Sequence, residues 1–273
     1  MKLAAVLFAA LAACASLHAA PVEGPARRIV SLMPSLTEDL CAIGARSRIV
    51  GVSAYSSDIG CVRGVPQVGN AASVDAESIL RLHADAVVGI PPQGMLMEPV
   101  RRAGVRTVLL SDNTYDDIFT DIDRLGALTG RAPQARELIA HLRSRTAQLR
   151  RMESRGRAPR VFVVIQAQPI WTVGPGSYIS TLLELAGARN AVASLPQPYA
   201  QYSAEALVRT APDAIVATSD SELSAALARP PWNSLAAVRK GRVYILRDDA
   251  ILVRPGPRYN EGLAWLIERL TLK

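Results

Sequence analysis

The stretch that decides the fold is "VDAESILRLHADAVV", residues 74–88, because the chain repeats it as "YSAEALVRTAPDAIV" at residues 202–216. The two copies align without a gap, and six of their fifteen positions are identical. In each copy helical spacing gives way to a short apolar, β-rich run, which predicts a helix followed by a buried strand. The repeat therefore indicates two similar α/β units in one chain.

The same alternation of helices and short β-rich runs extends on both sides of each copy. The expected strands are "RIVSLM", "RIVGV", "AVVGI", "VRTVLL", "RVFVVI", "AIVAT" and "RVYIL". Strands that alternate with helices imply parallel pairing and an α/β layer. After the first strand, "SLTEDLCAIGA" predicts a helix in which Ser35 is the N-cap and Glu38 completes a capping box.

Residues 114–154 interrupt this rhythm, because they contain no strand-like run. An apolar stripe there follows helical spacing at Ala135, Leu138, Leu142 and Leu149. A helix of about 20 residues is about 30 Å long, roughly the diameter of a domain. We therefore expect two α/β lobes joined by a single long rigid helix, with a ligand cleft between the lobes. The predicted bounds are 26–112 for the N-terminal lobe, 113–157 for the linker helices and 158–273 for the C-terminal lobe.

The start of the chain has the pattern of an export signal: Lys2 precedes a short apolar run, and small residues follow. That run is too short to span a bilayer as a finished helix. Two ways of processing remain open. Cleavage after Ala19 would remove residues 1–19, whereas "LAAC" resembles a lipoprotein signal that would remove residues 1–13 and acylate Cys14. Either outcome places the mature protein in the periplasm, with a lipid anchor in the second case.

Export also gives the other two cysteines an oxidising environment, in which a disulfide can form. Cys41 and Cys61 allow one pairing, but the sequence does not show whether their Cα atoms lie within the roughly 7 Å that a bridge needs. A disulfide and two buried thiols therefore both stay open. A catalytic cysteine is not expected, because no histidine stands in a companion motif.

Composition and motifs argue against several function classes. The formal net charge is +7, and the densest basic segment, residues 143–160, lacks the interleaved aromatic residues of a nucleic-acid surface. His83 and His141 have no partners at metal-ligand spacing, so we expect no metal site made by the protein. Nucleophile–base, Walker A and GxGxxG motifs are missing, so neither an enzyme nor a resident cofactor is expected. An exported hydrolytic enzyme with a two-lobed cleft remains as an alternative.

Two sets of charged residues are candidates for binding. "ILVRPGPRYN", residues 251–260, places Arg254 and Arg258 on a stiff loop after the last strand, where arginines suit carboxylate or phosphate groups or simply cap a turn. Asp75 and Ser203 are good N-caps, which puts a glutamate in the first turn of each repeated helix. Such a glutamate stabilises its helix by about 0.3–1 kcal/mol, and taken singly it requires no other role.

Several stretches resemble the periplasmic binding proteins of ABC importers that have a rigid helical backbone and serve cobalamin, haem and ferric siderophores. These stretches are "RIVSLMPSLTEDLCAIGARSRIVGVSAYS", "PQVGNAASVDAESILRLHADAVVGI", "GSYISTLLELAGARNAV", "PYAQYSAEALVRTAPDAIV" and "RPGPR". They are spread over residues 27–270, and their order and spacing together are specific. Within the family the likeness is greatest to the receptors for vitamin B12.

The resemblance implies a monomeric receptor that binds a metal chelate and delivers it to a permease dimer with its ATPase subunits. Cobalamin or a related corrinoid is the first expected ligand, and a ferric siderophore or haem is the alternative. The metal would arrive inside the ligand. In this family one surface glutamate on each lobe docks onto arginines of the permease, and the matching positions are Glu77 and Glu205.

The resemblance also implies a crevice lined from both lobes, often by aromatic side chains that press on a flat macrocycle. The matching ligand-binding positions are Ser35, Tyr55, Asn70, Gln93, Trp171, Tyr199, Arg254 and Arg258. This chain departs from the vitamin B12 receptors: small or polar residues at 70–72, prolines at 91–92 and tyrosine at 199 stand where those proteins have tryptophans. Fewer stacking faces weaken the cobalamin assignment and leave the chelate-receptor assignment standing.

Overall fold

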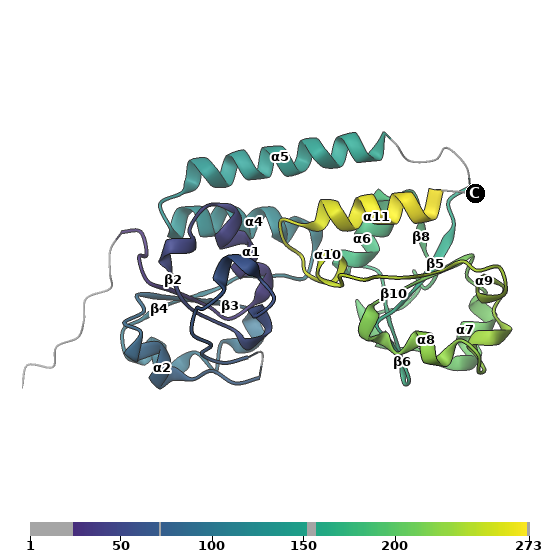
Figure 1. Cartoon of the computed structure of the whole chain (residues 1–273), viewed down its shortest axis with the longest axis horizontal. Helices are drawn as coiled ribbons and strands as arrows, with labels where there is room; N and C mark the ends of the chain where they lie inside the picture. Colours follow the sequence, from purple (N-terminus) through teal and green to yellow (C-terminus); the bar gives the residue numbers. More distant parts are fainter. Residues whose placement is uncertain (1–23, 71, 152–156, 272–273) are drawn as a thin grey trace, which may run out of the picture.

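The structure of the protein, a computed structural model, describes residues 24–70, 72–151 and 157–271. The expected export signal, its cleavage positions and Cys14 lie outside these residues. Two α/β lobes lie side by side, and helices run along one edge from one lobe to the other (Figure 1). The expected two-lobe α/β fold is confirmed.

The N-terminal lobe is built on a parallel sheet with the strand order β2-β1-β3-β4. Its strands are β1 (Ile29–Ser31), β2 (Ile49–Val52), β3 (Ala86–Gly89) and β4 (Arg106–Leu109). The connecting helices are α1 (Pro34–Ala42), η1 (Arg46–Arg48), η2 (Ala54–Ser56), η3 (Gly60–Val62), α2 (Ala76–Arg81), η4 (Pro91–Gln93) and α3 (Glu98–Arg102). Every residue of β1 and β3 is buried, which explains their unbroken apolar runs, since helices cover both faces of a parallel sheet.

The C-terminal lobe contains a second parallel sheet with the order β11-β10-β5-β8. Its strands are β5 (Arg160–Val164), β8 (Arg189–Asn190), β10 (Ala214–Ala217) and β11 (Val243–Ile245). Its helices are α6 (Tyr178–Leu185), α7 (Ala204–Thr210), η5 (Ser219–Ser221), α8 (Leu223–Ala226), η6 (Trp232–Ser234), α9 (Ala236–Arg239), α10 (Ala250–Val253) and α11 (Tyr259–Thr271). Each copy of the sequence repeat supplies a helix and the inner strand that follows it, α2–β3 in one lobe and α7–β10 in the other.

A small antiparallel sheet in the C-terminal lobe was not expected from the sequence. It consists of β6 (Gln166–Ala167), β7 (Ile170–Val173) and β9 (Tyr199–Gln201). β6 is too short to show a period, and β7 pairs with a strand that lies beyond α6 and β8 in the chain. Trp171 is paired with Gln201 and Val173 with Tyr199, so Trp171 and Tyr199 share one face of this sheet.

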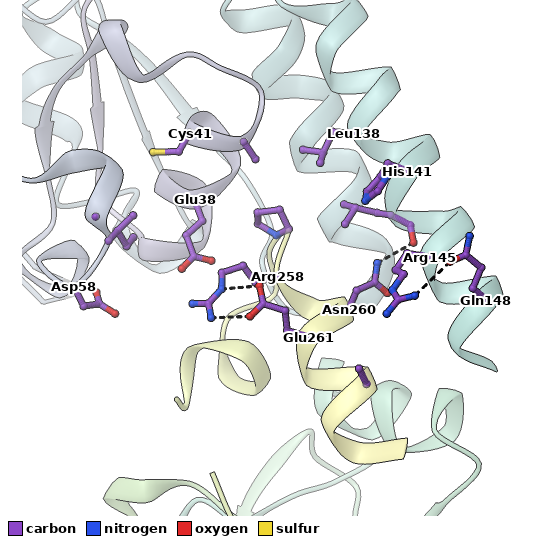
Figure 2. Close-up of a pocket in the computed structure, with 16 residues that line it drawn as sticks. Glu38, Cys41, Asp58, Leu138, His141, Arg145, Gln148, Arg258, Asn260 and Glu261 are labelled. Carbon is purple, nitrogen blue, oxygen red and sulfur yellow. Dashed lines mark hydrogen bonds and ion pairs between the residues drawn. The ribbon is translucent and has the colours of Figure 1, made fainter. Parts of the chain in front are cut away.

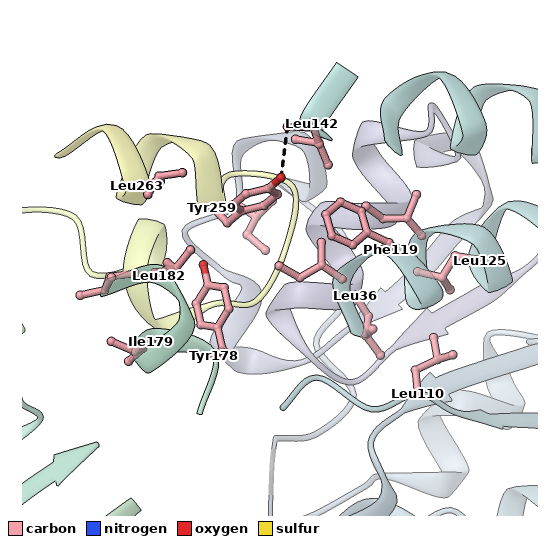
Figure 3. Packing of buried hydrophobic residues seen from close by; sticks show 14 of the residues in the cluster. Leu36, Leu110, Phe119, Leu125, Leu142, Tyr178, Ile179, Leu182, Tyr259 and Leu263 are labelled. Carbon is pink, nitrogen blue, oxygen red and sulfur yellow. Dashed lines mark hydrogen bonds between the residues drawn. The ribbon is translucent and has the colours of Figure 1, made fainter. Parts of the chain in front are cut away.

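The junction of the lobes is formed by α4 (Tyr115–Leu128), α5 (Ala132–Arg150) and α11. α5 is the counterpart of the expected connecting helix: its 19 residues extend about 28 Å, and it lies along the edge of the molecule (Figure 1). α5 packs on α4 and α11, so three helices share the junction. One core cluster runs through both lobes and these helices (Figure 3), with Leu36, Phe119, Leu142, Leu182 and Leu263 among its members.

The predicted capping box at the start of α1 is wrong. α1 begins at Pro34, and Met33 is its N-cap, with no hydrogen bond from a capping side chain. Proline suits the first helical position because its missing N–H would be unpaired there in any case. Ser35 therefore lies inside the helix, and Glu38 forms an ion pair with Arg254 of the C-terminal lobe.

The repeated residues fall into two groups once the fold is known. As predicted, Asp75 and Ser203 cap their helices by accepting hydrogen bonds from backbone N–H groups, at 2.9 and 3.1 Å. Asp85 accepts from the backbone N–H of Arg28 (3.1 Å) beside the first strand of its lobe, and the matching Asp213 does the same for Arg160 (2.8 Å). The fold explains these aspartates and the buried strand residues of the repeat, but it does not explain the glutamates and arginines.

Candidate ligand and docking sites

The eight expected ligand-binding residues come from both lobes, and the structure gives them different surroundings. Ser35 and Gln93 are buried. Ser35 donates a hydrogen bond to Asp112 (3.1 Å), which links the starts of the segments after β1 and β4. The Gln93 amide donates to the carbonyl of Leu32 (3.3 Å) and accepts from the N–H of Ile90 (3.0 Å). Gln93 therefore fastens the loop after β3, and its position does not support a role as a ligand contact.

Asn70 also has a local structural task. Its side-chain oxygen accepts hydrogen bonds from the backbone N–H groups of Ala72 (2.8 Å) and Ser73 (2.9 Å), which closes a tight turn. Asparagine is common in this role because its short side chain can bond to the backbone two residues further on. The predicted contact of Asn70 with a ligand stays a prediction, and it would have to use the amide nitrogen.

The aromatic candidates are the ones that the fold leaves accessible. The exposed fraction is 59% for Tyr55 and 45% for Tyr199, and Trp171 is half-buried. Tyr55 lies in η2 of the N-terminal lobe, whereas Trp171 and Tyr199 share one face of the small antiparallel sheet of the other lobe. An aromatic ring that is left accessible to solvent is a candidate stacking surface for a ligand.

Tyr199 also shows where the two lobes face one another. Partial burial raises the pKa of its phenol, and the carboxylate of Asp112 raises that pKa further. Asp112 follows β4 of the N-terminal lobe, and burial raises its own pKa although Ser35 donates to it. The backbone N–H of Tyr178, at the start of the helix after β7, donates to the carbonyl of Asn113 next to Asp112 (3.1 Å), so this part of the C-terminal lobe lies beside the carboxyl end of the N-terminal sheet, the end at which α/β proteins bind ligands.

The two arginines of the "RPGPR" loop are engaged inside the protein. Arg254 pairs with Glu38 (3.2 Å) and Asp58 (2.7 Å) of the N-terminal lobe. Arg258 pairs with Asp248 (2.6 Å) and Glu261 (2.9 Å) of its own lobe. A ligand carboxylate or phosphate would have to compete with these carboxylates, so the expected ligand contacts of both arginines stay predictions that this arrangement does not favour.

A pocket of about 1020 Å³ lies beside this loop, between α1, residues 58–60, α5 and the start of α11 (Figure 2). Its charged and polar lining residues are Glu38, Asp58, His141, Arg145, Gln148, Arg258, Asn260 and Glu261. Of the expected ligand-binding residues only Arg258 lines it, so this pocket is distinct from the region that Tyr199 marks.

Two further carboxyl groups, Asp39 of α1 and Asp121 of α4, are buried. Burial raises the pKa of Asp39 well above its usual value, and the nearby Asp121 carboxyl adds to the effect. Neither oxygen of Asp39 has a hydrogen-bond partner among the described residues. Burial raises the pKa of Asp121 to about 7, with smaller contributions from Asp117 and Asp112. These acids favour the protonated form, because burial disfavours an unpaired charge.

The structure pairs the two cysteines that the sequence left open. Cys41 of α1 and Cys61 of η3 form a disulfide, with their Cα atoms 6.5 Å apart. That distance lies within the range of ordinary disulfides. The bond fastens α1 to the long loop that follows β2.

The glutamates singled out by the repeat lie on the surface. The exposed fraction of the side chain is 80% for Glu77 and 82% for Glu205. Each forms an ion pair with the arginine four residues later in its helix, Arg81 or Arg209. Between them each helix leaves one apolar side chain exposed at matching positions, Leu80 and Val208. Both lobes thus display the same short set of a carboxylate, an apolar residue and a guanidinium.

Some kinds of site are not found in the part of the chain that the structure describes. Residues 24–70, 72–151 and 157–271 include no helix with the length and apolar character needed to span a membrane. The same residues contain no group of three or more histidine, cysteine, aspartate or glutamate side chains arranged to hold a metal ion.

Comparison of the chain with known proteins identifies its family. A family model described as periplasmic binding protein matches residues 29–250. The chain belongs to the periplasmic binding protein family. Members of this family are binding proteins of transport systems, so the family resemblance noted in the sequence is confirmed.

Individual relatives of this periplasmic binding protein include a lipoprotein and two solved structures. The uncharacterized ABC transporter substrate-binding lipoprotein YvrC of Bacillus subtilis is 28% identical over 253 residues, covering 89% of this chain and 80% of its own. The periplasmic vitamin B12 binding protein of Vibrio cholerae is 26% identical, with a TM-score of 0.78 over 90% of this chain and 97% of its own. A periplasmic heme binding protein from Pseudomonas aeruginosa is 28% identical, with a TM-score of 0.79 over 90% of this chain and 93% of its own.

Proposed function

We propose that this protein is the extracytoplasmic substrate-binding component of an ABC importer, which binds a metal chelate and delivers it to the permease. Cobalamin or a related corrinoid is the first candidate ligand, and haem or a ferric siderophore is the alternative. The names of the relatives support this assignment, since they include an ABC transporter lipoprotein, vitamin B12 binding proteins and a heme binding protein. The protein would perform no chemistry, and the metal would enter and leave inside the ligand.

The observation that carries the proposal is the matched exposed surface of the two lobes. Glu77 and Glu205 occupy equivalent positions, are mostly exposed and have no role in the core. An exposed i,i+4 pair with arginine contributes little to stability, so stability alone is a weak reason for repeating it. Two like surfaces on one chain suit a partner that presents two like sites, as a permease dimer does. Charges of this kind guide encounter and orientation more than they add affinity.

The ligand would bind where the two lobes face each other. Tyr55 on one lobe and Trp171 and Tyr199 on the other supply accessible aromatic faces, which suit a flat macrocycle. Ring stacking contributes about 0.5–1.5 kcal/mol per pair beyond the area buried. Three such faces from two lobes are enough to orient a macrocycle but offer no metal ligand other than the tyrosine oxygens.

Titration calorimetry of the purified protein with cyanocobalamin, haemin and several ferric siderophores tests the ligand class. One of these compounds is expected to bind with one-to-one stoichiometry, and a chelate carried through purification would show as visible absorbance. In the variant Tyr55→Ala/Tyr199→Ala the affinity for that compound is expected to fall about tenfold, because two stacking faces are removed. Binding of none of the compounds would contradict the proposal.

Cellular location belongs to the same proposal. The export signal expected at residues 1–19, or 1–13 with a lipid anchor at Cys14, would place the receptor in the periplasm. The relatives support this placement, since their names describe periplasmic proteins and a lipoprotein. Mass spectrometry of the N-terminus of the exported protein distinguishes acylated Cys14 from a free start at Ala20.

A further inference from the structure

Arg254 is a side chain of the C-terminal lobe that is held by the N-terminal lobe. It follows α10, and its guanidinium contacts Glu38 of α1 at 3.2 Å and Asp58 of the loop after η2 at 2.7 Å. The exposed fraction of the side chain is 19% for Arg254 and 8% for Glu38, whereas Asp58 is mostly open to solvent. The partners are separated by 216 and 196 positions in the chain, so the contact joins parts that no local structure brings together.

The backbone beyond Arg254 passes next to α1. A Cβ atom on Gly256 would lie 3.6 Å from Glu38 Oε2 and 3.6 Å from the carbonyl oxygen of Ser35. Glu38 Oε2 itself is buried and has no hydrogen-bond partner among the described residues, so Arg254 supplies the ionic partner of this carboxylate. Of the other charged groups around it, Asp58 repels Glu38 and Arg258 attracts it from a greater distance.

The disulfide joins the two elements that carry these carboxylates. Cys41 comes three residues after Glu38, on the next turn of α1, and Cys61 comes three residues after Asp58, in η3. Asp58 lies in the long loop after β2, and its side chain is mostly exposed. The disulfide is the covalent bond that ties this loop to α1. The crosslink therefore restrains the segments that carry Glu38 and Asp58, and a restrained pair of carboxylates binds a guanidinium fork better than a mobile pair.

We infer that Arg254, Glu38 and Asp58 form an ion-pair latch that fixes the orientation of the two lobes, and that the Cys41–Cys61 disulfide positions both carboxylates for it. The latch adds an ionic connection to the covalent path through α4 and α5 and to the apolar core that the two lobes share. It lies beside hydrogen bonds from Tyr259 and Asn260 to the carbonyl of Leu142 in α5, at 3.1 and 3.0 Å. Because Arg254 serves the latch, it is a positioning residue for the region between the lobes.

Electron spin resonance tests the latch, because it measures the distribution of distances between a label on one lobe and a label on the other. Spin labels are attached through p-acetylphenylalanine at the exposed positions Met95 and Val208, one on each lobe, so that the disulfide is left untouched. The variants are Arg254→Gln and, as the matched control, Arg258→Gln, which removes the same charge from the same loop but breaks ion pairs within one lobe. Circular dichroism confirms that each variant is folded, and Asp58→Asn replaces Arg254→Gln if the latter does not fold.

The width of the distance distribution is expected to increase about twofold in Arg254→Gln, because the buried pair is lost, and to stay at the wild-type value in Arg258→Gln. Asp58→Asn is expected to give a smaller increase. An unchanged width in Arg254→Gln, or in Asp58→Asn if that variant has to replace it, would overturn the latch. Equal broadening in Arg254→Gln and Arg258→Gln would do so too, since it would assign the effect to the charge of the loop.

The part played by the disulfide is tested in the same labelled proteins before and after reduction with a phosphine. Reduction is expected to broaden the wild-type distribution and to add nothing in Arg254→Gln, because the disulfide acts through the latch. Cys41→Ser/Cys61→Ser is expected to match the reduced wild type. Equal further broadening of Arg254→Gln on reduction, or no change in the wild type, would overturn the role of the disulfide and leave the latch itself standing.

Discussion

The protein contains two kinds of glutamate–arginine pair, and they differ in almost every physical respect. Glu77–Arg81 and Glu205–Arg209 are exposed and lie within single helices, whereas Glu38–Arg254 is mostly buried and joins two lobes. Exposed pairs gain little in water and are screened by salt, so their carboxylates remain available to another protein. A buried pair is costly to break, because it leaves one charge without a partner in a poorly solvated place. The same pair of residue types is thus proposed to serve recognition at one location and lobe orientation at another.

The largest expected effect comes from breaking the buried pair. Arg254→Ala is expected to lower the free energy of unfolding by roughly 2–3 kcal/mol, less than the 3–5 kcal/mol typical of fully buried pairs, because Glu38 can take up a proton. Chemical denaturation at pH 7 measures the change. Arg258→Ala is the control, and an equal loss there would remove the distinction between the inter-lobe pair and the pairs within one lobe.

Asp121 extends the comparison to a buried carboxyl group that forms no ion pair with an arginine among the described residues. Burial raises the pKa of Asp121 from 3.8 to about 7. Between pH 4 and pH 7 the folded protein therefore binds more protons than the unfolded chain, and stability falls as the pH rises through this window. The substitution Asp121→Asn removes the ionisable group and with it this loss of stability at high pH. Its Tm is expected to exceed that of the wild type at pH 8 by about 2–4 °C, for a gain of the order of 1 kcal/mol.

The pH dependence provides the control for this prediction. Below pH 4 the Asp121 carboxyl is protonated in both states, so the Tm values of Asp121→Asn and the wild type are expected to converge. Calorimetric scans at pH 4 and pH 8 give both differences. A constant difference across this range would show that the substitution acts through packing and not through the buried charge.

The smallest effect on stability is expected at the exposed pairs. Glu77→Gln/Glu205→Gln is expected to leave the Tm within about 2 °C of the wild type, because mostly exposed ion pairs contribute little. Thermal scans in low and high salt measure it. A loss comparable to that of Arg254→Ala would mean that the repeated glutamates are retained for the fold, and the reason for assigning them to a partner would disappear.

Features that depend on neighbouring residues could be predicted from the sequence. The N-caps Asp75 and Ser203, the first-turn positions of Glu77 and Glu205 and the strands β3 and β10 that follow these helices could be predicted from local pattern and from the repeat. Capping and periodicity are short-range effects, so one sequence contains enough information to place them.

Features that depend on distant partners could not be predicted in this way. Glu38 has capping-box spacing from Ser35, but an arginine 216 positions away determines its role. Gln93 looks like a loop residue open to a ligand, yet it is turned inward by the carbonyl of Leu32. The antiparallel sheet that presents Trp171 and Tyr199 depends on pairing across α6, which leaves no periodic signal in strands of two to four residues.

The most direct test of the account compares ligand binding and transport in the variant Glu77→Ala/Glu205→Ala. Affinity for the ligand that binds the wild type is measured by calorimetry, and uptake is measured in cells that contain the importer and the wild-type amount of receptor. The account predicts an affinity within about twofold of the wild type and uptake reduced at least about tenfold, because exposed charges guide docking and not ligand binding. Unchanged uptake at that receptor level would contradict it.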